Sequence, residues 1–141
     1  MKRFQNNVLS KDVAAAILIA ENLFKPESLM MQEMKEKNDF KYNSGTGIEV
    51  YNKILNCKTI APVFTYRPKL PWSKAMGYSD GTAIHLNLRK LDTFNLSELI
   101  GLTVHEYLHL VGFSHGSNFP SAEKNQYSVN YFCSQNIKRW L

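Results

Sequence analysis

The stretch HEYLHLVGFSH, residues 105–115, holds three of the four histidines of this 141-residue chain. His105 and His109 are four residues apart, so on a helix their imidazole rings lie on one face and can reach one metal ion. Glu106 comes about 100° round the helix from His105. There it can lie beside the metal without binding it, and can accept a proton from a water molecule.

The third histidine depends on a turn at Gly112. If the helix continued, His115 would lie roughly 15 Å beyond His105 along the axis, at about 1.5 Å per residue. Gly112 can adopt a left-handed conformation at no steric cost, which ends the helix and lets the chain fold back. We therefore expect a positive φ at Gly112 and one zinc ion per chain, bound by His105, His109 and His115. Three histidine ligands leave a fourth position open for water, as in catalytic zinc sites.

Local signals upstream of this stretch predict its helix and a hairpin. Asn95-Leu-Ser-Glu98 is a polar cap followed three residues later by glutamate, so we expect the helix to run from there to about Val111. Asp80-Gly81 lies between two strand-like segments, which is a strong hairpin signal. We expect these strands over residues 75–79 and 83–88, and an earlier strand over 59–66, where β-branched and aromatic residues are frequent.

The rest of the chain has mainly helical patterns. Ser10 and Pro26 bound a helix whose apolar residues recur on one side. The other expected helices are 27–39, 48–55, where a strand is the alternative, and 127–141. Loops are expected over 43–47, 67–71 and 113–126. Residues 1–45 should thus form a helical N-terminal part, and the order of the elements indicates an α+β fold.

Composition and charge are typical of one globular domain spanning residues 1–141. Hydrophobic residues make up 44% of the chain and charged residues 21%, and no apolar run has the roughly 20 residues of a membrane span. The net charge is +5, but the cations are spread thinly, which favours a basic surface over a nucleic-acid footprint. Two cysteines are too few for a disulfide framework. The short apolar run 13–20 is more typical of a helix than of a signal peptide, so we expect a cytoplasmic protein or one that is released by another route.

The pattern His105-Glu106-x-x-His109-x-x-Gly112-x-x-His115 resembles the motif of the metzincin zinc peptidases. More loosely, residues 65–131 resemble small metallopeptidase-like proteins of phages and bacteria. The resemblance implies a zincin-like domain with a twisted mixed sheet over the active-site helix. It also implies an antiparallel edge strand, here 75–79, that binds an extended protein or peptide substrate. The implied activity is a zinc endopeptidase with Glu106 as general base.

One feature of the metzincin pattern is missing. That family has a methionine turn beneath the metal, whereas this chain has no methionine after Met76. Residues 128–131 fall about where the turn would be, with Asn130 in place of methionine. In some relatives a nearby tyrosine supports the transition state, a role that Tyr131 or Tyr127 could take here; packing is the alternative for either ring.

A second family gives the alternative function. Zinc-dependent rRNA-maturation endoribonucleases of the YbeY type carry a similar motif, and this chain shares its Leu108-His109-Leu110 and Gly112. They have glycine where this chain has Glu106. Because an amine leaving group must be protonated, a carboxylate at that place favours peptide hydrolysis over RNA cleavage. His85, the fourth histidine, is expected in the inner strand as a core or cleft-lining residue rather than a ligand.

Overall fold

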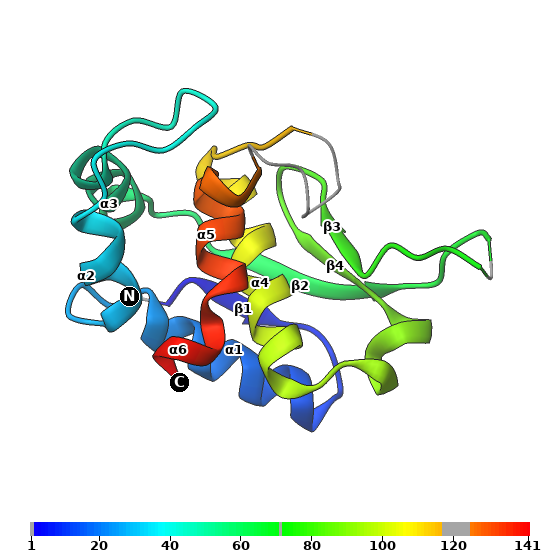
Figure 1. The fold of residues 1–141 in the computed structure, drawn as a ribbon. Coiled ribbons are helices and arrows are strands. Elements are labelled where there is room, and N and C mark those ends of the chain that lie inside the picture. Colours follow the sequence, from blue (N-terminus) through cyan, green and yellow to red (C-terminus); the bar gives the residue numbers. More distant parts are fainter. Residues whose placement is uncertain (1, 71, 117–124) are drawn as a thin grey trace.

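The computed structural model describes residues 2–70, 72–116 and 125–141, and the strands within them form one mixed sheet (Figure 1). The strands are β1 (Phe4–Asn6), β2 (Ala61–Tyr66), β3 (Gly77–Ser79) and β4 (Ile84–Asn87), in the spatial order β1-β2-β4-β3. β1, β2 and β4 are parallel, whereas β3 pairs antiparallel with β4 at the edge. The helices are α1 (Lys11–Leu23), α2 (Leu29–Lys35), α3 (Gly47–Asn56), α4 (Leu96–Val111), α5 (Val129–Gln135) and α6 (Ile137–Trp140). The fold is α+β, as expected.

Helix α4 begins and ends where the sequence predicts. The Asn95 side chain accepts a hydrogen bond from the Glu98 backbone N–H at 2.8 Å, and the Glu98 carboxylate accepts one from Asn95 N–H at 3.3 Å. This reciprocal capping box satisfies donors that the first turn would otherwise leave unpaired. At the other end Gly112 has φ +119°, which confirms the left-handed turn. The Gly112 N–H donates to the carbonyl of Leu108 and so closes the helix.

The hairpin predicted around Asp80-Gly81 is present, with shorter strands than expected. β3 covers only Gly77–Ser79 of the expected segment 75–79, and β4 covers only Ile84–Asn87 of the expected segment 83–88. The contact continues beyond the strands, since Asn87 N–H donates to the Met76 carbonyl at 3.0 Å. A 3₁₀ helix, Leu88–Thr93, then links β4 to α4; it was not predicted from the sequence.

The prediction of a purely helical N-terminal part is wrong. β1 precedes the helices and pairs in parallel with β2, with Phe4 opposite Ala61. Glu21 of α1 fixes this strand, because its carboxylate accepts hydrogen bonds from the backbone N–H groups of Arg3 and Phe4 at 2.8 and 2.9 Å. β1 has three residues, of which only Phe4 is buried, so its sequence shows no alternation from which to infer a strand.

Several predicted boundaries also need correction. The helix expected over 27–39 is shortened to α2, which Ser28 caps. The helix expected over 127–141 is divided into α5 and α6 at Asn136. The helix over 48–55 is confirmed as α3, with a capping box between Thr46 and Glu49. Of the expected loops 67–71 and 113–126, Pro71 and residues 117–124 lie outside the described residues.

Helix α4 lies at the centre of the molecule and contacts α1, α5, α6, β3 and β4 (Figure 1). One hydrophobic core joins buried residues from Phe4 in β1 to Trp140 in α6, so the N-terminal segment belongs to the same core as the histidine helix. Cys57 and Cys133 are free thiols. None of the helices in the described part of the chain combines the length and apolar character that a membrane span needs.

Candidate metal centre

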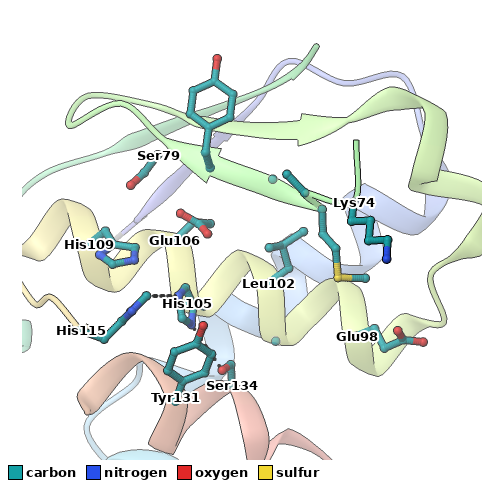
Figure 2. Close-up of a pocket in the computed structure, with 15 residues that line it drawn as sticks. Lys74, Ser79, Glu98, Leu102, His105, Glu106, His109, His115, Tyr131 and Ser134 are labelled. Carbon is teal, nitrogen blue, oxygen red and sulfur yellow. Dashed lines mark hydrogen bonds between the residues drawn. The ribbon is translucent and has the colours of Figure 1, made fainter. Parts of the chain in front are cut away.

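The three histidines of residues 105–115 converge at the end of α4 (Figure 2). Each offers one ring nitrogen, and these nitrogens all lie within 4.8 Å of one another. The Nε2 atoms of His105 and His115 are 3.0 Å apart, although ten residues separate them. The turn at Gly112 brings this about, because it reverses the chain directly after the helix. The donor set is therefore arranged as a metal site with three nitrogen ligands requires.

The second nitrogen of each ring faces an oxygen atom. His109 Nδ1 lies 3.0 Å from the Phe113 carbonyl, and His115 Nδ1 lies 3.3 Å from the Gly116 carbonyl. His105 Nδ1 is 3.4 Å from the Ser134 hydroxyl. Since a carbonyl accepts only, Nδ1 of His109 and of His115 carries the proton and Nε2 keeps its lone pair. Metal-binding histidines typically have such outer partners, so the rings present here fit a zinc ion.

Burial also keeps His105 and His109 neutral. Desolvation, together with the neighbouring His109 and His115, lowers the pKa of His105 to about 3. Desolvation and His115 likewise lower the pKa of His109. A histidine binds a metal only when it is unprotonated, so both rings are ready to bind at neutral pH.

Glu106 lies between α4 and the edge strand β3 (Figure 2). Its side chain is buried, and desolvation raises its pKa to about 7, while hydrogen bonding to the side chain and backbone of Ser79 acts in the opposite direction. The carboxyl group points into the cleft beside the histidines and is absent from the three-histidine cluster. A carboxyl group in this position can accept and donate protons beside a metal without binding the metal itself.

Helix α5 supports the cluster from the other side. The Tyr131 ring packs against His105 and His115, with centroid distances of 4.6 and 4.7 Å. Asn130 is fully buried and donates from Nδ2 to the His105 carbonyl at 3.2 Å. Asn130 thus joins α5 to α4 directly under the histidines, and this bond holds Tyr131 at the cleft.

The cleft above the cluster has a volume of about 780 Å³. One wall is the segment from Lys74 through β3, and the other is the face of α4 from Glu98 to His109. The α4 wall, from Glu98 to His109, is about 16 Å long at about 1.5 Å per residue. Roughly five residues of an extended chain have the same length. The cleft therefore suits an extended chain better than a small compact ligand.

Three further residues lie outside this arrangement. His85 does not line the cleft or the core; it is on the opposite face of the sheet, with Nε2 2.8 Å from the Asp80 carboxylate. Tyr127 is 53% exposed and does not line the cleft, so Tyr131 is the tyrosine that approaches the histidines. Trp72 is largely exposed on the segment before β3.

Two serines of the site were not predicted. Ser134 lies one helical turn after Tyr131, so its place on the same face of α5 could have been inferred once Tyr131 was assigned. Ser79 alternates with Tyr78 on β3, but the sequence does not show which of the two faces α4. Comparisons with known proteins add no further evidence, since no family model, no curated protein and no solved structure matches this chain.

Proposed function

We propose that this chain is a zinc-dependent endopeptidase with a zincin-like fold, similar to the metzincins. One observation carries the proposal: three histidines each turn one ring nitrogen toward a common point, directly beside a buried glutamate at an open sheet edge. His105, His109 and His115 would hold the zinc. When bound, zinc polarises the substrate carbonyl and makes water a stronger acid.

Glu106 moves the proton in this proposal. It accepts the proton of the attacking water and delivers it to the nitrogen of the departing amine, which cannot leave as an anion. Ser79 keeps the carboxyl group oriented toward the cleft. Tyr131, whose ring lies against His105 and His115, stands at the cleft and can donate a hydrogen bond to the carbonyl oxygen as charge develops on it.

The edge strand β3 binds the substrate backbone. Asp80 N–H and the Met76 carbonyl bond to β4 partners, Ala83 and Asn87. Because backbone groups alternate in direction along a strand, Gly77 presents its N–H and carbonyl to the free edge. Ser79 presents its carbonyl there, while its N–H contacts Glu106. A peptide that adds there as a further strand lies along the cleft, with a peptide bond over the histidines.

Cleavage of an unstructured protein tests the proposal. Purified chain is incubated with casein and, separately, with single-stranded RNA, with and without a chelator. We expect casein cleavage that chelation abolishes and zinc restores, and no RNA cleavage. Zinc-dependent cleavage of RNA without cleavage of casein would instead support the endoribonuclease alternative.

A further inference from the structure

The outer face of the sheet, opposite α4, carries a row of stacked aromatic rings. Phe64, His85 and Tyr78 lie directly opposite one another on β2, β4 and β3. The Tyr78 and His85 rings are 4.6 Å apart and 15° from parallel, and the Phe64 and His85 rings are 5.8 Å apart at 24°. Tyr66 adds an edge contact to Tyr78 at 5.0 Å. We call these four residues the aromatic row.

The aromatic row is rigid and open to solvent. The Asp80 carboxylate holds His85 in place at 2.8 Å, and is itself fixed by the backbone N–H groups of Thr82 and Ala83. The Phe64 side chain is nevertheless 40% exposed and Tyr78 44% exposed. Exposed rings held in a fixed orientation are unusual on a solvated surface and favour a partner that stacks on them.

Positive charge gathers at one end of this row. β2 and β4 are parallel and end together, with Tyr66 opposite Asn87, and the segment before β3 returns to Asn87, whose side chain donates to the Ala75 carbonyl at 2.8 Å. Two segments adjoin this end: the one before β3, residues 67–70 and 72–76, and the one after β4, residues 88–93. Together they contain five cationic residues and one acidic residue, Asp92. We call the five cations the basic end: Arg67, Lys69, Lys74, Arg89 and Lys90.

The basic end has no neutralising partner within the described residues, where no ion pair involves any of its five cations. Trp72, 73% exposed, lies between Lys69 and Lys74 on the segment that extends beyond β3 (Figure 1). Aromatic rings interleaved with unpaired cations are typical of surfaces that bind single-stranded nucleic acids, where bases stack and phosphates pair with Lys and Arg.

We propose that the outer face of the sheet binds single-stranded nucleic acid. Bases stack on exposed Trp72 and on the two outer rings of the aromatic row, Phe64 and Tyr78, and phosphates contact the basic end. An acidic peptide would meet the same charges but has no flat rings to lie against these exposed aromatic residues. Because Ile84 and Leu86 face the core while His85 faces outward, the aromatic row and the histidine cluster lie on opposite sides of the sheet. Lys74 of the basic end also lines the cleft, but the aromatic row faces away from it. The nucleic acid is thus a binding partner whose recognition does not require the peptidase proposal.

Fluorescence anisotropy of a labelled 12-nucleotide oligo-dT, titrated with the full-length chain, tests this. We expect binding with a slope of log K against log salt between about −2 and −3.5, as three to five phosphate contacts on a single strand give. Phe64→Ala with Trp72→Ala should weaken binding at least about tenfold. Arg67→Glu with Arg89→Glu should weaken it further and flatten the slope. The matched control is Lys11→Glu with Lys25→Glu on α1 and just after it, which should have little effect. Thermal unfolding followed by circular dichroism checks that each variant is folded.

Two further measurements sharpen the test. The first distinguishes binding at this face from binding at the metal centre, and the second distinguishes a nucleic acid from another polyanion. Chelation and His105→Ala should leave oligo-dT binding unchanged, and a 12-residue glutamate peptide should bind much more weakly. Intrinsic fluorescence should be quenched by oligo-dT through exposed Trp72, since Trp140 is buried. The proposal is overturned if oligo-dT does not bind, if both charge-reversal pairs act equally, if His105→Ala abolishes binding, or if the glutamate peptide binds as tightly.

Discussion

His115 is the proposed ligand that depends most on the path of the chain, because it lies outside α4 and reaches the other histidines only through the turn at Gly112. We expect His115→Ala to lower zinc affinity by more than about 100-fold, since loss of an outer hydrogen bond alone costs 10–100-fold. Competition with a chromogenic chelator measures this affinity. The control is His85→Ala, which removes the one histidine outside the cluster and should leave zinc affinity unchanged. Equal affinities for both variants would show that His115 is not a ligand.

Gly112 is the second residue on which the site depends. A side chain there would find room, with Lys53 as its neighbour at 3.4 Å, so the cost of a substitution comes from φ +119°. A β-branched residue fits this region poorly, and we expect Gly112→Val to weaken zinc binding at least tenfold by displacing His115. Gly81→Val is the matched control, because Gly81 also has a positive φ, of +91°, with open space around it and no part in the site. Both variants should lose stability, but only Gly112→Val should lose zinc. Tight zinc binding by Gly112→Val would contradict the role of this turn.

At the scale of the elements, the hairpin between β3 and β4 depends on the ionised form of Asp80. Its carboxylate accepts hydrogen bonds from Thr82 and Ala83 and faces His85, and these contacts hold its pKa well below the usual range. The stabilisation is therefore complete above the unfolded-state pKa of about 4 and is lost as the pH falls toward the lower folded-state pKa. We expect Asp80→Asn to unfold at a lower temperature than the wild type at pH 6. The difference should narrow progressively as the pH falls from 4 toward 2, as thermal unfolding followed by circular dichroism will show. A difference that is constant over this range would contradict the assignment.

The elements that sequence predicted well are those with strong local signals. α4 and α1 begin at side-chain caps, and the hairpin follows a dipeptide with a specific turn preference, so each was predictable from a few adjacent residues. β1 was not, because its partner β2 lies more than 50 residues away and only Phe4 marks its buried side. The division of the last helix at Asn136 was also not predicted, because nothing in the local sequence requires a helix to end there.

The same distinction applies to the site. His105, Glu106, His109 and Gly112 could be assigned because helix periodicity fixes their geometry. Ser79, Ser134 and the Asn130 bond to α4 could not, because they depend on how β3 and α5 pack against α4. The sequence thus predicted the groups for the chemistry, and tertiary packing supplies the groups that orient them.

At the scale of the whole molecule, the N-terminal segment is part of the core and lies away from the cleft. β1 is at the opposite edge of the sheet from β3, and the Phe4 ring packs on Tyr107 of α4 at 5.0 Å. We expect Phe4→Ala to lower the free energy of unfolding by about 3–5 kcal/mol, as loss of a buried Phe does. Chemical denaturation measures this, with exposed Gln5→Ala as the control. A removable prosegment would behave differently: Phe4→Ala would then raise peptidase activity at little cost in stability.

The central claim is that a zinc centre and Glu106 together hydrolyse peptide bonds. Zinc content and casein cleavage, measured on the same samples of wild type and Glu106→Gln, test it most directly. Glu98→Gln is the matched control, because Glu98 lies on the same helix and lines the same cleft, and glutamine keeps its capping role. We predict about one zinc per chain in all three proteins and casein cleavage by wild type and Glu98→Gln. Glu106→Gln should be slower by about 10²–10⁴-fold, the usual contribution of general acid–base catalysis. Zinc-loaded wild type that cleaves no casein, or Glu106→Gln that cleaves as fast as wild type, would contradict the claim.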